Sequence, residues 1–300
     1  MNAHHYLKHV EEKLQELAAE TDAVKKSAGF QQYLDTMAKF WQYSYHNQLL
    51  IHFALPSATR VAGFKTWSSL GRRIKKGSKA IMILAPVTRI EKKDDKEEKV
   101  IVNFSPVNVF DVSQTEGQEL PVLEITLKGD DQQKLLDSLM SFCEAKGIKL
   151  NFKELGVNGL YGYSQGGQIV VSSQDSVNTK VNTLVHEIAH ELLHQTGEGK
   201  SLSKQQKEIQ AEGTAYVVCK HFGLETKSFT YLALYEADSQ QIMANLEAIA
   251  KASKEVIEFL IFIFLSRFAR INNKNLSRSR SNGNKLSCMF SNFSFIQNDL

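Results

Sequence analysis

Two histidines and a glutamate within residues 186–190 have the types and spacing of a metal-dependent hydrolytic site. The motif is His186-Glu187-Ile188-Ala189-His190. A helix places its two imidazoles one turn apart on the same face, where both can reach one metal ion. Zinc held in this way lowers the pKa of its water toward about 7, and Glu187 can accept a proton from that water. The motif predicts a zinc-dependent peptidase site with Glu187 as catalytic base.

A pair of carboxylates in the next predicted helix offers the third metal ligand. Glu208 follows His190 by eighteen residues, and Glu212 lies one helical turn further on. We expect Glu208 to be the third ligand, since three protein ligands leave a fourth position for water. Glu212 is then expected to accept the outer N–H of a ligand histidine. Two alternatives stay open: Glu212 as the ligand, and both carboxylates on a solvated helix face.

Other residues near the motif have competing interpretations. Tyr161 and Tyr163 lie on the strand predicted before the motif helix and are candidates for stabilising an oxyanion, although packing explains them as well. His194 follows His190 by one turn, and a capping or surface role is favoured for it over a place at the substrate rim. No CxxC pair occurs, which favours free thiols in a reducing compartment for Cys143, Cys219 and Cys288.

The elements that must position this chemistry are predicted to be mostly helical. Apolar periodicity predicts helices at 130–146, 177–195, 202–222 and 236–262. A short strand is predicted at 148–153, and a hairpin around Gly166-Gly167 joins 160–163 to 168–172. The second half is therefore expected to be a helical domain with a small sheet.

The first half has a different predicted organisation. Helices are expected at 4–20 and 28–54, and strand-like runs follow at 80–87, 100–104 and 107–112. The charge run 91–99 reads as a solvated hairpin loop, and 113–121 reads as a linker. The fold class is thus α+β with two domains, a small α+β domain at 1–120 and a mostly helical one at 121–262. An atypical tail is expected at 263–300, and its composition indicates either disorder or a shifted reading frame.

Positive charge is concentrated in the first half of the chain. The net charge is only +3, yet no acidic residue occurs between Asp35 and Glu91, a stretch with nine basic ones. Aromatic residues are interleaved with these charges, as single-stranded nucleic acid binding requires, although a core role is the alternative for the aromatics. The residues expected to contact single-stranded DNA are Arg60, Lys65, Trp67, Arg72, Arg73, Lys75, Lys76 and Lys79.

Neither end of the chain predicts a membrane protein. The N-terminus lacks an apolar signal core, and the apolar run 259–265 is too short for a bilayer that needs about twenty residues. We therefore expect a cytoplasmic protein.

Two sets of residues resemble ArdC-type antirestriction proteins. The first set includes Trp41, Asn47, the segment ATRVAGFKTW at 58–67 and the segment VFDVSQTEG at 109–117. The second set, TLVHEIAH at 183–190 with Glu208 and Glu212, is similar to their zincin-like peptidase domain, which is related to ImmA and IrrE peptidases. The resemblance covers about residues 30–260, and the tail departs from it.

The resemblance carries its own expectations. It implies single-stranded DNA binding by the first domain and Glu208 as third ligand. It also implies that the protein is carried by a plasmid or another mobile element and protects incoming DNA from restriction. Three hypotheses follow: a DNA-binding zinc peptidase acting on an unidentified protein substrate, a regulatory peptidase that cleaves a repressor, and a non-enzymatic DNA protector with a structural metal. An intact Glu187 speaks against the third, because a structural site needs no base.

Overall fold

The computed structural model describes residues 2–20, 22–93, 96–120, 131–157, 159–224 and 237–276. Packing divides the described chain into two units. The first contains residues 2–13 and 42–120, and the second contains residues 14–41 and those from 131 onward. The α+β fold class with two domains, the second mostly helical, is confirmed. The limits 1–120 and 121–262 stay predictions, and the packing adds that residues 14–41 group with the second unit.

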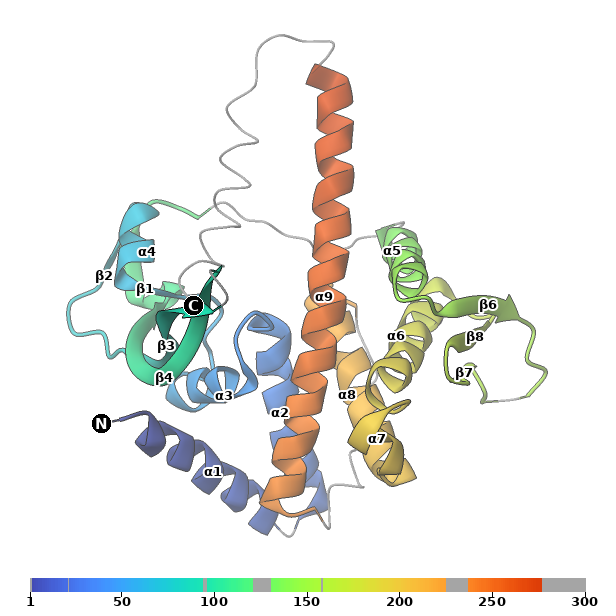
Figure 1. Ribbon diagram of the computed structural model, residues 1–300, viewed down its shortest axis with the longest axis horizontal. Helices are drawn as coiled ribbons and strands as arrows, with labels where there is room; N and C mark the ends of the chain where they lie inside the picture. The colour runs from blue at the N-terminus through green and yellow to red at the C-terminus, as the bar shows by residue number, and fades with distance from the viewer. Residues whose placement is uncertain are drawn as a thin grey trace. The chain divides into compact units, whose positions relative to one another are not determined.

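The first unit is built around a long antiparallel hairpin (Figure 1). Its sheet has the order β1-β4-β3, and β2 pairs separately with β5. The elements are α3 (Tyr45–Ala54), β1 (Val61–Gly63), α4 (Phe64–Ser69), β2 (Arg72–Ile74), β3 (Ile81–Lys93), β4 (Lys96–Asp111), the 3-10 helix η1 (Val112–Gln114) and β5 (Thr115–Gly117). The first residues of α1 (Ala3–Ala19) also belong to this unit. Buried Trp67, Ile81 and Ile83 form part of its core.

Three expectations about the first unit are wrong, and the reasons are local. The charge run 91–99 does lie at the end of a hairpin, but most of it is strand and not loop, because the β3–β4 ladder pairs as far as Lys93 with Lys96. The runs 100–104 and 107–112 therefore form one strand, β4. The expected helix 28–54 is two helices, because Ser44 caps a new one by accepting a hydrogen bond from the backbone N–H of Asn47.

The segment expected to be a linker is an ordered part of the first unit. Asp111 is the N-cap of η1 and forms a capping box with Gln114. Its carboxylate also accepts hydrogen bonds from the backbone N–H groups of Thr59 and Arg60, at 2.8 and 2.9 Å. Residues 115–117 then pair as β5 with β2. Polar composition here reflects hydrogen bonds made within the fold and not flexibility.

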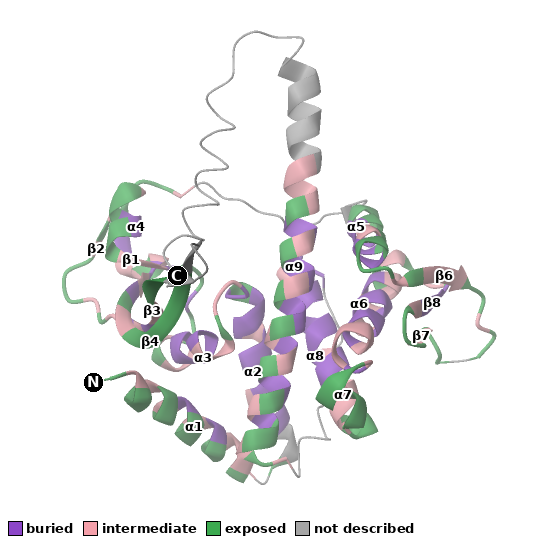
Figure 2. Cartoon of the chain, viewed as in Figure 1, coloured by how far each residue is buried: buried purple, intermediate pink, exposed green. Residues whose placement is uncertain are grey.

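The second unit places a three-stranded sheet and several helices around α6. Its elements are α2 (Ala23–Lys39), α5 (Asp131–Ala145), β6 (Lys149–Lys153), β7 (Gly162–Ser164), β8 (Gln168–Ser172), α6 (Val177–Leu193), α7 (Gly197–Ser201), α8 (Lys204–His221) and α9 (Ser239–Leu276). The sheet order is β6-β8-β7, with β6 parallel and β7 antiparallel to β8. Figure 2 shows buried residues gathered on α6, α8 and the first part of α9.

The helix α9 is longer than expected and includes the first part of the predicted tail. It continues to Leu276, so residues 263–276 are helical and not disordered, because the apolar run 259–265 extends a helix already formed. Residues 277–300 lie outside the described residues. Across the described ranges, no helix combines the length and apolar character that crossing a membrane requires.

Candidate metal centre

The apolar residues of α6 determine which face of the helix is buried, and therefore where the motif histidines lie. Ser176 caps the helix by accepting a hydrogen bond from the backbone N–H of Thr179, at 3.2 Å. The residues that it buries completely are Val181, Leu184, Val185, Ile188 and Ala189. These recur at helical spacing, so the two motif histidines are left together on a partly exposed face.

The helix α8 brings Glu208 opposite that face. It begins with a capping box formed by Ser203 and Gln206. A Cβ on Gly213 would lie 2.4 Å from the Ile249 side chain of α9, so α8 packs where a larger residue would clash. Close packing of α8 against both α6 and α9 fixes where Glu208 stands.

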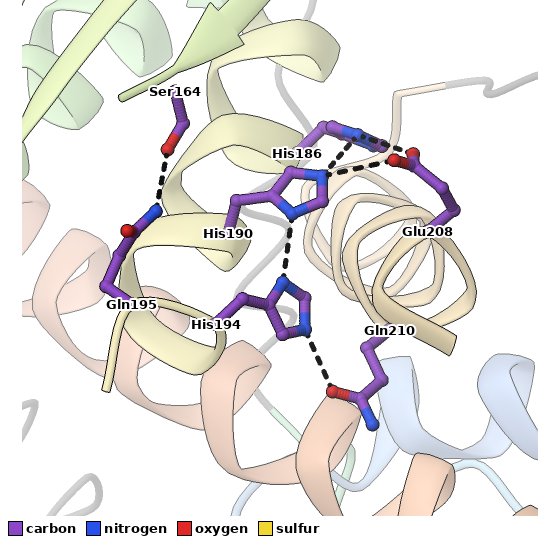
Figure 3. Close-up of polar contacts among 7 residues, drawn as sticks. All are labelled: Ser164, His186, His190, His194, Gln195, Glu208 and Gln210. Carbon is purple, nitrogen blue, oxygen red and sulfur yellow. Dashed lines mark hydrogen bonds and ion pairs between the residues drawn. The ribbon is translucent and has the colours of Figure 1, made fainter. Parts of the chain in front are cut away.

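Three side chains converge on one point between α6 and α8 (Figure 3). The Nε2 atoms of His186 and His190 are 3.0 Å apart. Glu208 places one carboxylate oxygen 3.4 Å from Nε2 of His186 and the other 3.9 Å from Nε2 of His190. Tetrahedral zinc with bonds of about 2.0–2.1 Å would space its nitrogen and oxygen ligands at about 3.3 Å. The observed spacing and donor set therefore fit a divalent transition metal.

The electrostatics of these three groups are strongly coupled. Burial alone would lower the pKa of His186, but the hydrogen bond to Glu208 and the neighbouring carboxylates raise it. The hydrogen bond with His186 lowers the pKa of Glu208 below its usual range. Burial lowers the pKa of His190 to about 4, and the charge of His186 adds to this. His190 is thus neutral at pH 7, as a metal ligand must be.

Glu187 is buried beside the three converging groups. Only 7% of its surface is exposed, and burial raises the pKa of its carboxyl to about 7. The backbone of β7 covers it, because a Cβ on Gly162 would lie 3.6 Å from Cγ of Glu187 and 2.6 Å from the Thr183 side chain. A carboxyl with a pKa near 7 can both accept and return a proton at neutral pH.

The strand β7 is fastened to α6 by a second carboxylate. Glu191 accepts hydrogen bonds from the Ser164 hydroxyl, at 2.5 Å, and from the backbone N–H of Gly167, at 2.6 Å. Since Gly162 and Ser164 both face α6, the alternation of strand residues turns Tyr163 to the opposite face. Tyr163 is therefore not aimed at Glu187, and Tyr161 is half exposed just before the strand.

The structure assigns His194 a place that the sequence did not predict. It is 5% exposed, and its Nδ1 lies 2.9 Å from Nδ1 of His190. Glu212, which was expected to accept that N–H, makes no hydrogen bond to either motif histidine among the contacts of the described residues. The spacing of four residues after His190 was a visible signal, but burial of His194 by α8 was not.

The predicted DNA contacts fall into two groups in the first unit. Six of the eight side chains are exposed: Arg60, Lys65, Arg73, Lys75, Lys76 and Lys79. Phe64, between two of these in the sequence, is 64% exposed. Lys75 is anchored by a hydrogen bond from its Nζ to the Ser113 carbonyl, at 2.7 Å.

The other two predicted contacts serve the fold. Trp67 is 2% exposed, and its Nε1–H donates to the Phe110 carbonyl at 2.9 Å, so the expectation that it stacks on a base is wrong. The half-buried Arg72 donates from Nε to the Thr115 hydroxyl at 2.7 Å and from its terminal nitrogens to the carbonyls of Thr115 and Gln118. These bonds tie β2 to β5 and the residue after it, and they use three of the five N–H donors of the guanidinium.

Comparisons with known proteins give the same two-part organisation. Residues 5–125 match the N-terminal domain of anti-restriction factor ArdC, and residues 143–261 match the IrrE N-terminal-like domain of a peptidase family. The chain therefore has an ArdC-type architecture, with the metal centre inside the IrrE-like domain.

Individual relatives are more distant. The chain is similar to an uncharacterized protein of Bacillus anthracis, with 27% identity over 294 residues that cover 81% of this chain and 49% of that one. It thus spans about half the length of that relative. It is also similar to the metal-free crystal structure of the antirestriction protein ArdC from plasmid R388, with 16% identity, a TM-score of 0.49, and coverage of 83% of this chain and 97% of that one. For the Mn(II)-bound structure the values are 17%, 0.46, 77% and 97%.

Proposed function

We propose that this ArdC-type protein is a zinc-dependent peptidase that also binds single-stranded DNA and protects incoming DNA from restriction. The observation that supports the peptidase most directly is the convergence of His186, His190 and Glu208 beside a buried Glu187. A structural zinc site is usually closed by four protein ligands, whereas three ligands with an adjacent base are the pattern of a hydrolytic site.

The chain's own groups have defined tasks in this proposal. When bound, the metal supplies Lewis acidity to water and to the peptide carbonyl. Glu187 takes up a proton from the attacking water and returns it to the leaving amine, as a positioned carboxylate can. The β7 backbone lies close to Cγ of Glu187, and only 7% of this residue is exposed to solvent.

A peptide substrate suits the sheet beside the centre. In the order β6-β8-β7, β7 is an edge strand, and it lies against α6 next to Glu187. An extended chain can add to such an edge through backbone hydrogen bonds. This favours a protein with an unstructured segment as substrate.

Metal analysis tests the peptidase part of the proposal. We expect about one zinc per chain in the wild type and its loss in His186→Ala and Glu208→Ala. Glu212→Ala is the matched control, because it removes a carboxylate from the same helix one turn away. Retention of metal by Glu208→Ala with loss in Glu212→Ala would reverse the two roles, and parallel titrations with Zn²⁺ and Mn²⁺ identify the preferred ion.

The DNA-binding part rests on the exposed basic side chains of the first unit. Six of them lie within residues 60–79 without an intervening acidic residue. Titration with single-stranded oligonucleotides at several salt concentrations tests this part, since phosphate contacts give affinity that falls as salt rises. Salt-independent binding, or none, would contradict it.

The antirestriction part is tested in cells. Entry of unmodified DNA into a restricting host is expected to rise when the wild-type protein is present. If Glu187→Gln protects as well as the wild type, protection does not need hydrolysis, and the DNA-binding unit alone accounts for it. If a cellular repressor is cleaved instead, the regulatory peptidase is the better description.

A further inference from the structure

A chain of buried polar side chains leads away from the metal centre, on the side opposite the metal position. Nδ1 of His190 lies 2.9 Å from Nδ1 of His194, and Nε2 of His194 lies 3.0 Å from Oε1 of Gln210 (Figure 3). Nε2 of Gln210 donates to Oδ1 of Asn245 at 3.0 Å. The chain thus crosses from α6 through α8 to α9.

These side chains are buried more deeply than the metal ligands themselves. His194 and Gln210 are each 5% exposed and Asn245 is 2% exposed, whereas the side chain of Glu208 is 42% exposed. Buried polar groups are costly unless each finds a partner, so a connected row of them inside a helical unit must satisfy its own hydrogen bonds.

Each hydrogen bond must join a donor to an acceptor, and this requirement fixes the direction of donation along the four side chains. A metal ligand at Nε2 of neutral His190 needs that nitrogen's lone pair, so the proton of the ring must be on Nδ1. His190 then donates to Nδ1 of His194, and a neutral His194 carries its own proton on Nε2. That proton points at Oε1 of Gln210, an acceptor, and the amide nitrogen of Gln210 donates onward to Asn245. Every link has one donor and one acceptor.

We propose that His194, Gln210 and Asn245 are positioning residues that fix the tautomer and ring orientation of His190 for metal binding. This inference rests on the metal site proposed above. Residues that hold the outer nitrogen of a ligand histidine typically contribute a factor of about 10 to 100 to metal affinity. We call this row of hydrogen-bonded side chains, from His190 to Asn245, the relay. Because the relay ends at Asn245, α9 contributes to the metal site although it carries none of the three ligands. The role expected for Glu212 is filled by a histidine on the motif helix.

The proposal predicts losses of metal affinity that decrease from His194 to Gln210 to Asn245. His194→Phe keeps a ring of similar size but removes both nitrogens, so Zn²⁺ affinity should fall by about 10- to 100-fold in a chelator competition. Gln210→Met should give a smaller loss, and Asn245→Leu the smallest. Gln205→Met, at an exposed position of the same helix α8, is the matched control and should retain wild-type affinity. Equal affinity in wild type, His194→Phe and Gln210→Met would overturn the relay.

Spectroscopy of the wild type tests the relay without any variant. In the Zn²⁺-loaded protein, long-range ¹H–¹⁵N spectra of the histidine rings should show a protonated Nδ1 and a metal-bound Nε2 for His190, with slow exchange of the Nδ1 proton. A bare Nδ1 on His190 would overturn the proposal, even if His194→Phe failed to fold. A wild type that takes up no Zn²⁺ would overturn the peptidase proposal together with the relay. Zinc uptake that His186→Ala abolishes and His194→Phe leaves unchanged would overturn the relay alone.

Discussion

The candidate metal centre of the second unit and the basic surface of the first unit use their characteristic residues in opposite ways. In the second unit, the residues of the HExxH motif are the groups expected to react, and buried neighbours hold them in place. In the first unit, the residues of the ArdC-like segment 109–117 are scaffolding, while six of the seven basic side chains expected to bind are exposed.

This difference shows what each kind of site requires. A hydrolytic site needs a few groups held within fractions of an ångström, and the second unit surrounds His186, His190 and Glu208 with helices and buried polar side chains. Phosphate contacts are longer ranged and tolerant of position, so it is enough for Asp111 and β5 to support a surface that carries exposed lysines. Substitutions should therefore act sharply in one unit and gradually in the other.

The largest expected effect is that of Glu187→Gln. The amide cannot accept a proton, so hydrolysis of unfolded peptides, followed by mass spectrometry, should slow by about 10²- to 10⁴-fold. Zinc content should stay at the wild-type level, because Glu187 is outside the group of three ligands. Unchanged cleavage would mean that Glu187 is not the catalytic base.

The seam between β7 and α6 should tolerate no added methyl group. A Cβ at residue 162 would lie 2.6 Å from the Thr183 side chain and 2.8 Å from the Val170 carbonyl, so Gly162→Ala should lower the free energy of unfolding by about 1–3 kcal/mol. Gly63→Ala in the first unit is the control, because a Cβ there meets nothing within 4 Å. If both variants lose the same stability in denaturant titrations, the contact between β7 and α6 is no tighter than the surroundings of Gly63.

Acid should weaken the first unit through Asp111. Burial alone would raise the pKa of this carboxyl, but backbone N–H donors from Arg60, Ser113 and Thr59 hold it below the ordinary 3.8. Because the folded pKa is depressed, the stabilisation is complete above about pH 4 and is lost as pH falls through the folded value. Asp111→Asn should cost about 1–3 kcal/mol at pH 7, and its difference from the wild type should shrink below pH 4. A difference that is independent of pH would contradict this assignment.

The basic surface should respond in proportion to the charges removed. Lys76→Ala with Lys79→Ala should reduce the slope of log affinity against log salt for single-stranded DNA by at most about 0.7 for each phosphate that these lysines neutralise in the wild type. Lys149→Ala with Lys153→Ala, on exposed positions of β6, is the matched control in the other unit. If both pairs lower the slope equally, the DNA site is not confined to the first unit.

The smallest expected effect separates two neighbouring arginines. The ion pair of Arg73 with Glu116, at 2.8 Å, is exposed on both sides, so Arg73→Ala should change the free energy of unfolding by less than about 1 kcal/mol. Arg72→Ala breaks the bonds that join β2 to β5 and should cost more stability. If Arg73 proves the more important for stability, the division between scaffold and surface is misplaced.

The sequence predicted what depends on short spacing. The helix of His186 and His190, the hairpin at Gly166-Gly167 and the convergence of Glu208 follow from periodicity and from residues eighteen positions apart. Contacts between distant segments were not predictable: Trp67 reaches Phe110 across 43 residues, and Arg72 reaches Thr115 across the same interval. The burial of His194 depends in the same way on how α8 packs.

The pairing of α2 with α8 has a consequence for the order in which the chain acquires its structure. Asp35 of α2 accepts a hydrogen bond from the Tyr216 hydroxyl of α8, a residue 181 positions later. At synthesis rates of about 5–20 residues per second, roughly 10 to 40 seconds pass before α2 meets its partner. During that interval the β1–β5 segment can close, while the apolar face of α2, with Phe30, Leu34 and Met37, waits uncovered on the ribosome. The apolar face of α2 is therefore expected to stay accessible to chaperones for that interval after it has been synthesised.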